Sequence, residues 1–330
     1  MTPPSIALFA GDPAGIGPEL VAKLLAAPEA LPPVRVRLIA QRESLDAAAR
    51  ACGVVLDLPA LSVADAGRPE PALARLEWSG WNAPAFTQAQ ATAANGAFML
   101  DGLKLALDLA QRGAVDAVCF APLNKAALRA AGMAHEDELR WFAEVLDYHG
   151  ACGEFNVLET LWTSRVTSHV PLKDVAGMIS AQRVAEAIGM LHDALRRAGN
   201  RSPRIGVCGL NPHNGDNGNF GREELDIIAP GIRLAADQGY RAEGPYPADT
   251  IFVRAKNGAF DGVVTMYHDQ GQIAMKLMGF ERGVTVQGGL PVAITTPAHG
   301  TAYEIAGRGI AHIEAMRNAL AIAARMGAAR

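Results

Sequence analysis

Short apolar segments alternate with longer amphipathic segments along the chain. The short segments are rich in β-branched residues, as buried strands are, and they cover residues 5–10, 34–40, 114–121, 164–170, 204–210, 261–267 and 291–296. The amphipathic segments 94–113, 181–199 and 313–327 repeat apolar residues at helical spacing, and each ends at or near a glycine, which terminates helices readily. This alternation predicts an α/β protein with largely parallel sheets covered by helices.

Two stretches interrupt the alternation. Residues 62–84 are rich in proline, glycine and tryptophan and are interpreted as a long surface excursion. The segment 131–134 lies between two regular parts of the chain, and a break between two domains is placed there.

Composition and charge narrow the class of protein. The chain has 330 residues, half of them hydrophobic, and a formal net charge of -4. A mildly acidic chain without a basic cluster gives no indication of nucleic-acid binding, and no apolar run is long enough to span a bilayer. The N-terminal residues lack the features of a signal peptide, and the four cysteines show no metal-binding spacing, so a cytoplasmic protein with reduced thiols is expected.

Three histidines follow apolar runs: His169, His213 and His268. In open α/β sheets, ligands bind at the carboxyl ends of the strands. Three imidazoles meeting there would form a catalytic metal site, since three protein ligands leave one coordination position open for water or a substrate hydroxyl. Taken singly, each histidine is better interpreted as a hydrogen-bonded structural residue, and the wide separation of the three in sequence shows nothing by itself. Their shared placement at strand ends shifts the balance toward the metal interpretation without deciding it.

Other segments carry candidate binding groups. The stretch 298–311 is glycine-rich, and its Glu304 is a candidate acceptor for the ribose hydroxyls of adenosine, although a plain loop before the last helix is the alternative. Residues 10–20, AGDPAGIGPEL, are either a simple strand-to-helix turn or backbone lining a cleft. Lys276 comes two helical turns after His268 and either snorkels or anchors an anion.

Taken together, these motifs resemble the 4-hydroxythreonine-4-phosphate dehydrogenase family. The resemblance rests on segments in the family's order: GDPAGIGPEL, APLNKAALRAAG, LNPHNGD, GREELDIIAP, GPYPADTIF, MYHDQGQIAMK and HGTAYEIAGRG. It implies an isocitrate and isopropylmalate dehydrogenase-like fold, with two α/β/α domains and a cleft between them. The first domain is expected at 1–130 plus 290–330, and the second, which carries the metal histidines, at 131–289.

The resemblance also implies a site. The residues it assigns are His169, His213 and His268 as ligands of a divalent metal, Zn²⁺ first and Mg²⁺ or Co²⁺ as alternatives; His299, Gly300, Glu304, Ile305 and Gly307 as contacts of NAD; and Lys276, Asp249 and Asp269 as catalytic groups. An acidic residue followed by isoleucine is associated with NAD rather than NADP. A homodimer is expected, with the active site completed at its interface. The metal would acidify the bound hydroxyl and then stabilise the enolate left by decarboxylation.

The chain departs from the family where the substrate is held. Without gaps, the Gly-His-Thr-Glu clamp of the family falls on residues 137–140, which places Glu138 beside the substrate together with Lys276 and Thr285. A carboxylate near a phosphate dianion repels it, so an unphosphorylated hydroxy acid is expected, such as a terephthalate-type cis-dihydrodiol carboxylate. The alternatives are a genuine 4-hydroxythreonine-4-phosphate dehydrogenase and, from another class, a metal-dependent lyase or a non-catalytic protein that binds small acids.

Overall fold

The computed structural model describes residues 2–329, apart from the side chain of Phe280. The chain divides into two compact units, residues 1–149 with 290–330 and residues 150–289. This division places residues 131–149 in the first unit. No helix among the described residues is both long and apolar enough to cross a bilayer.

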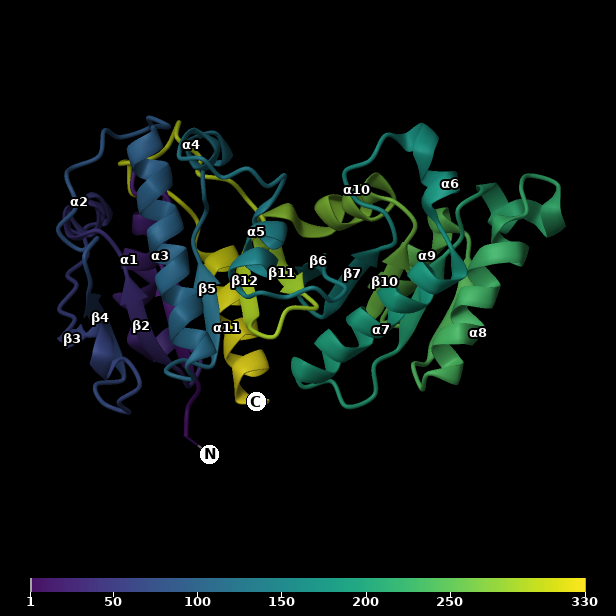
Figure 1. Cartoon of the computed structure of the whole chain (residues 1–330), viewed down its shortest axis with the longest axis horizontal. Coiled ribbons are helices and arrows are strands. Elements are labelled where there is room, and N and C mark those ends of the chain that lie inside the picture. The colour runs from purple at the N-terminus through teal and green to yellow at the C-terminus, as the bar shows by residue number, and fades with distance from the viewer. Residues whose placement is uncertain (1, 330) are drawn as a thin grey trace. The chain divides into compact units, whose positions relative to one another are not determined.

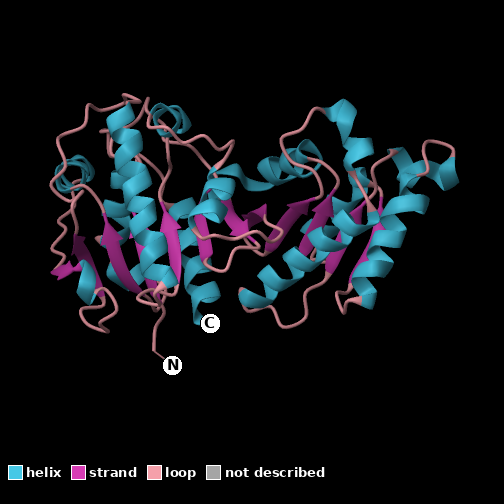
Figure 2. Ribbon diagram, in the orientation of Figure 1, coloured by secondary structure: helices cyan, strands magenta, loops and turns pink. Residues whose placement is uncertain are grey.

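The first unit is an α/β sandwich around a parallel sheet (Figures 1 and 2). Its strands are β1 (Ser5–Phe9), β2 (Arg35–Ile39), β3 (Ala60–Ser62), β4 (Leu73–Glu77), β5 (Ala117–Phe120) and β12 (Ala293–Pro297), in the order β3-β4-β2-β1-β5-β12 with every pair parallel. Its helices are α1 (Gly17–Leu25), α2 (Arg42–Cys52), α3 (Ala93–Gln111), α4 (Lys125–Ala130), α5 (Glu138–Val145) and α11 (Glu314–Ala328). Every residue of β1 is buried, so helices cover both faces of the sheet at its centre.

The second unit contains a mixed sheet. Its strands are β6 (Gly153–Leu158), β7 (Leu161–Arg165), β8 (Ile205–Cys208), β9 (Ala242–Tyr246), β10 (Gly262–Thr265) and β11 (Val284–Gly288), in the order β11-β6-β7-β10-β8-β9. Its helices are α6 (Val175–Met178), α7 (Ala181–Arg197), α8 (Ala229–Asp237), α9 (Ala248–Lys256) and α10 (His268–Gly279). The pairs β11–β6 and β6–β7 are antiparallel, and the rest are parallel. The expected α/β class with largely parallel sheets is confirmed.

Helix α7 shows how the sequence pattern produces these elements. The hydroxyl of Ser180 accepts a hydrogen bond of 3.2 Å from the amide of Arg183 and caps the helix. Val184, Ile188 and Leu191 recur at helical spacing and are all buried. The helix therefore covers the sheet of the second unit with one apolar stripe.

The predicted surface excursion at 62–84 is wrong in one part. Residues 73–77 form β4, which pairs with β2 on one side and β3 on the other. Arg37 of β2 is fully buried beside the loop that precedes β4. Its guanidinium donates to the carbonyls of Ala66 at 2.7 Å and Pro71 at 2.9 Å, which fixes this loop against the sheet.

Candidate functional site

The three candidate histidines follow three neighbouring parallel strands of the second unit. Strand β10 lies between β7 and β8 and pairs in parallel with both. His169 follows β7, His213 follows β8 and His268 begins the helix after β10. Because the carboxyl ends of parallel strands lie at one edge of a sheet, the topology brings the three loops together there, as expected from the sequence.

His169 and His268 are close neighbours. Their ring centroids lie 5.5 Å apart, at a cavity of ≈ 240 Å³. That cavity is lined by Thr167, His169, Val170, Leu172, Val175, Tyr267, His268 and Asp269. Nδ1 of His268 lies 2.7 Å from a carboxylate oxygen of Asp269. A carboxylate at Nδ1 fixes the proton on that nitrogen and leaves the Nε2 lone pair available to a metal.

Hydrogen bonds through Met266 connect these loops. The amide and the hydroxyl of Thr167, after β7, both donate to the carbonyl of Met266, at 3.1 and 2.7 Å. The amide of Met266 donates to the side-chain oxygen of Gln270 at 2.7 Å, and the side-chain nitrogen of Gln270 donates to the carbonyl of Gly209 at 2.9 Å. Gln270 thus joins the His268 corner to the loop that follows β8, a role that the sequence analysis missed.

The loop after β8 is held by a buried carboxylate. Glu224 accepts the amides of Leu210 at 2.7 Å and Asn211 at 2.6 Å, and its side chain is almost fully buried. Residues 213–217, HNGDN, all have φ between 43° and 75°. Asparagine, aspartate and glycine tolerate this left-handed region better than other residues do, which explains the composition of the turn that carries His213.

The structure tests how far these residues fit a metal. No group of three or more histidine, cysteine, aspartate or glutamate side chains is arranged to hold a metal ion within residues 2–329. The structure brings His169 and His268 together, and this pair fits two imidazole ligands beside an open cavity. His213 lies on the neighbouring loop, and its place as the third ligand stays a prediction.

The other candidate groups of the second unit occupy separate elements. Lys276 is exposed on α10, between the exposed side chains of Ile273 and Leu277. Asp249 is exposed in the first turn of α9. Thr285 is half-buried on β11, opposite Asn156 of β6. The catalytic and substrate-binding roles of these three residues stay predictions.

Glu138 lies in the first unit, at the start of α5. Its carboxylate is 3.9 Å from Nζ of Lys125, on the neighbouring α4. The preceding residue, Asp137, accepts the amide of Arg140 at 2.9 Å and caps α5. The segment 137–140, which aligns with the family's substrate clamp, is therefore a capped helix start whose charged side chains form ion pairs.

The glycine-rich loop after β12 is attached to the first strand-to-helix turn. Asp12 is completely buried, and it accepts hydrogen bonds from the hydroxyl of Tyr303 at 2.5 Å and the amide of Ala14 at 3.0 Å. Burial raises the pKa of Asp12 despite these bonds. Burial likewise lowers the pKa of His299, which favours the neutral imidazole.

The loop presents its predicted cofactor contacts differently. Glu304, Gly300 and Gly307 are exposed, whereas His299 and Ile305 are partly buried. All five lie in one loop of the first unit, as the sequence predicts, although the structure does not test their contacts with NAD.

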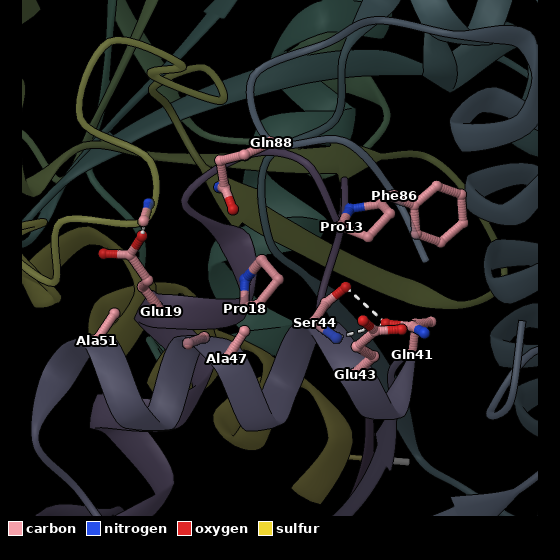
Figure 3. A pocket seen from close by; sticks show the side chains of 13 residues that line it. Pro13, Pro18, Glu19, Gln41, Glu43, Ser44, Ala47, Ala51, Phe86 and Gln88 are labelled. Atoms are coloured by element: carbon pink, nitrogen blue, oxygen red, sulfur yellow. Dashed lines mark hydrogen bonds between the residues drawn. The ribbon is translucent and has the colours of Figure 1, made fainter. Parts of the chain in front are cut away.

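A cavity of ≈ 230 Å³ lies beside this loop in the same unit (Figure 3). It is lined by Pro13, Gly15, Pro18, Glu19, Gln41, Glu43, Ser44, Ala47, Ala48, Ala51, Phe86, Gln88 and Gly307. The polar groups of Gln41 are used within the fold, since its side chain accepts from the hydroxyl of Ser44 at 2.7 Å and donates to the carbonyl of Ala83 at 3.1 Å.

Comparison with solved structures defines the class of protein. A crystal structure of a 4-hydroxythreonine-4-phosphate dehydrogenase from Burkholderia phymatum matches with a TM-score of 0.82 and 36% identity over 98% of each chain. A terephthalate 1,2-cis-dihydrodiol dehydrogenase from Burkholderia xenovorans matches with a TM-score of 0.68 and 28% identity over 95% of each chain. The expected fold is confirmed, and the chain has the architecture of dehydrogenases that act on a CH–OH group.

The family follows from the sequence matches. The chain belongs to the family described as pyridoxal phosphate biosynthetic protein PdxA, whose model matches residues 34–323. A Pseudomonas aeruginosa relative, provisionally named 4-hydroxythreonine-4-phosphate dehydrogenase 2, is 55% identical over 98% of this chain and 97% of its own. A D-threonate 4-phosphate dehydrogenase from Cupriavidus necator is 38% identical over 98% of both chains.

Proposed function

We propose that this protein oxidises the secondary alcohol of a small 4-phosphorylated hydroxy acid, with NAD as the hydride acceptor and a divalent metal at the substrate hydroxyl. The observation that carries this proposal is the similarity to dehydrogenases named for 4-phosphorylated substrates, which extends over nearly the whole chain. The likeness to the dihydrodiol dehydrogenase is weaker in both identity and TM-score. These matches favour 4-hydroxythreonine 4-phosphate over the unphosphorylated acid expected from Glu138.

The names of the relatives give two candidate substrates that share the part of the molecule that reacts. 4-Hydroxythreonine 4-phosphate and D-threonate 4-phosphate both carry a carboxylate at C1, a hydroxyl at C3 and a phosphate at C4. One relative named for each compound, from Geobacter metallireducens and Cupriavidus necator respectively, is 38% identical to this chain. Oxidation at C3 of either compound places a ketone β to the carboxylate, so loss of carbon dioxide is included in the proposal. 4-Hydroxythreonine 4-phosphate is the first candidate because it names the 55% identical relative.

The proposed groups have distinct tasks. His169 and His268, with His213 as the expected third ligand, would hold a divalent metal, for which Zn²⁺ suits an imidazole set. When bound, the metal supplies a Lewis acid that acidifies the C3 hydroxyl and stabilises the enolate formed by decarboxylation.

The remaining groups act on the substrate and cofactor. Lys276 contributes a cation for the substrate's carboxylate or relays a proton, with Asp249 and Asp269 as further candidates for proton transfer. Glu304 would accept hydrogen bonds from the ribose hydroxyls of NAD and would repel the 2′-phosphate of NADP. A homodimer that completes the active site at its interface, and a cytoplasmic location, belong to the same proposal.

Substrate comparison tests the proposal directly. Purified protein loaded with Zn²⁺ is mixed with NAD and, separately, 4-hydroxythreonine 4-phosphate, D-threonate 4-phosphate and the cis-dihydrodiol of terephthalate. The proposal expects NADH absorbance to rise fastest with a phosphorylated substrate, with release of carbon dioxide in equal amount. Faster turnover of the dihydrodiol would overturn the substrate assignment, and failure to bind NAD would favour the lyase or binding-protein alternative.

A further inference from the structure

Glu19 is a buried carboxylate of the first unit, whereas the strand-end histidines belong to the second. It lies in the first turn of α1 and is only 2% exposed. One oxygen accepts a hydrogen bond from the amide of Gly307, and the other accepts one of 2.7 Å from the amide of Gly309 (Glu19 is labelled in Figure 3). Burying a carboxylate is unfavourable in free energy unless its oxygens accept hydrogen bonds, and these two amides supply those bonds.

Helix α1 and its N-terminal turn hold the same loop at further points. The amide of Ile16 donates to the carbonyl of Thr301 at 3.0 Å. The ammonium group of Lys23 donates to the carbonyl of Ala311 at 2.9 Å. Together with Glu19, these bonds fix the loop from residue 301 to residue 311 along one helix.

Backbone geometry at the end of the loop agrees with a fixed conformation. Gly309 has φ +66°, and a Cβ atom there would lie 2.2 Å from the carbonyl oxygen of Ala51. Only glycine permits this close approach to the end of α2. At Gly309 the loop therefore contacts two helices: its backbone packs against the end of α2, and its amide donates to Glu19 of α1.

The cavity beside Glu19 shows what holds the loop there. Glu19 and Gly307 both line the ≈ 230 Å³ cavity, together with the side chain of Gln88 (Figure 3). A Cβ atom on Gly307 would come no nearer than 3.5 Å to any neighbour. Packing leaves space at Gly307, so the hydrogen bond that its amide donates to Glu19 defines the position of this residue, while Gly309 is held both by its own bond to Glu19 and by its close approach to Ala51.

We infer that Glu19 is a positioning residue that holds the 299–309 loop in the conformation that binds the cofactor. NAD then binds without the free-energy cost of ordering this loop. The two acidic side chains have opposite tasks in this proposal, because Glu19 is buried and accepts hydrogen bonds from the loop amides, whereas Glu304 is exposed. A loop held in its bound conformation before binding gives a higher affinity than one ordered on binding. This inference rests on the proposed function, in which the loop binds NAD.

The test is Glu19→Gln, which keeps the shape but replaces one acceptor oxygen with an NH₂ group facing an amide. The KM and Kd for NAD are expected to rise about tenfold, as loss of a hydrogen bond to a charged acceptor implies. The kcat and the KM for the hydroxy acid should stay within about twofold of the wild-type values, since in this proposal Glu19 contacts neither the hydroxy acid nor the reacting atoms. Glu43→Gln is the matched control: it removes the same charge from the same cavity wall and should leave all four constants unchanged.

A second measurement needs no cofactor. Hydrogen exchange at the amides of Gly307 and Gly309 should be faster in Glu19→Gln than in the wild type and Glu43→Gln. Glu19→Asp, which shortens the side chain by one methylene, is expected to give intermediate exchange and affinity, and it replaces the glutamine variant if that variant does not fold.

The outcomes separate this inference from the proposed function. A wild type that binds NAD, with Glu19→Gln binding it equally well, overturns the positioning role alone. A wild type that binds no NAD overturns both the cofactor assignment and the role of Glu19 in it. Weaker NAD binding together with faster exchange, at constant kcat, supports the inference.

Discussion

The hydroxyl of Tyr303 donates a hydrogen bond of 2.5 Å to the completely buried carboxylate of Asp12, across 291 positions of sequence. Asp12 belongs to the turn after the first strand, and Tyr303 belongs to the proposed cofactor loop. The bond therefore joins the beginning of the first unit to the segment that returns to it at the end of the chain.

This bond gives a prediction about stability and pH. Burial raises the pKa of Asp12 above its ordinary value of 3.8, whereas the Tyr303 bond lowers it. The native state thus holds the proton more tightly than the unfolded state, so the stabilisation present below pH 3.8 is lost as the pH rises through the folded pKa. The free energy of unfolding of the wild type should fall relative to that of Asp12→Asn over this interval.

Tyr303→Phe sharpens the same test. It should lower the free energy of unfolding by about 1–3 kcal/mol and move the loss of stability to higher pH, because a bond that favours the ionised carboxylate is gone. Urea titrations at several pH values measure both effects. Parallel pH profiles for the wild type and Asp12→Asn would show that Asp12 does not titrate abnormally.

The metal assignment predicts that zinc binding requires each of the three histidines. His169→Ala, His213→Ala and His268→Ala should each reduce bound Zn²⁺ from roughly one ion per chain to a small fraction, because two imidazoles hold a divalent ion poorly. His149→Ala, a change at an exposed histidine outside the three loops, is the control. Metal content after dialysis and calorimetric titration give the measurement. A His213→Ala variant that keeps its zinc would remove His213 from the ligand set.

The proposed cofactor loop predicts a change of specificity. Glu304→Lys should lower kcat/KM with NAD and raise it with NADP, by about tenfold or more in their ratio, since a lysine attracts the 2′-phosphate that a glutamate repels. Asp46→Lys, at an exposed position on α2 of the same unit, makes the same charge change as a control. An unchanged NAD-to-NADP ratio in Glu304→Lys would count against the ribose role.

The sequence predicts the continuously apolar strands well and the more polar ones poorly. Strands β1, β2, β5, β8 and β10 fall within predicted apolar runs and β12 exceeds its run by one residue, because strands buried on both faces are continuously hydrophobic. The run predicted at 164–170 is wrong in most of its length, since β7 ends at Arg165. Strand β4 reads LARLE and alternates charged with buried residues, so its composition is that of a surface segment. Strand β9 carries a glycine and a proline at the sheet edge, which a periodicity analysis assigns to a turn.

In the candidate site, too, features that depend on neighbouring residues are predictable from the sequence, whereas contacts between residues distant in sequence are not. Strand-end placement of the three histidines is a local property and follows from the pattern. The Glu19 bond to Gly307 spans 288 positions and the Gln270 bond to Gly209 spans 61, and neither residue stands out by composition. Only the tertiary structure shows that these two side chains support the loops on which the candidate residues lie.

The thiols give a test of burial in the folded protein. Within the described residues the four cysteines form no disulfide, and burial raises the pKa of Cys119 and of Cys208 to about 12. At pH 8 only about one part in ten thousand of such a thiol is ionised, so both should resist alkylation until the protein unfolds. Cys52 and Cys152 are only partly buried and should be modified before the other two. Peptide mapping after iodoacetamide treatment, with and without urea, identifies the sites; equal labelling of Cys119 in both states would contradict its burial.

The Lys125–Glu138 pair gives a test of where a phosphorylated substrate binds. Its two charges lie 3.9 Å apart, and the carboxylate is largely buried whereas the ammonium is more than half exposed. If the phosphate binds near this pair, Glu138 opposes the dianion and partly neutralises Lys125. Glu138→Gln should then lower the KM for 4-hydroxythreonine 4-phosphate about three- to tenfold, and leave the KM of an unphosphorylated acid unchanged.

Glu136→Gln is the matched control for this experiment, since it removes a more exposed carboxylate that lies 3.7 Å from Arg140 on the same segment. Equal effects of both variants would indicate a general change in net charge rather than a contact with the substrate. A KM for the phosphorylated substrate that rises in Glu138→Gln would instead show that the carboxylate holds Lys125 in its working position. An unchanged KM would remove Glu138 from the substrate-binding residues and leave the departure at 137–140 as a difference in how α5 begins.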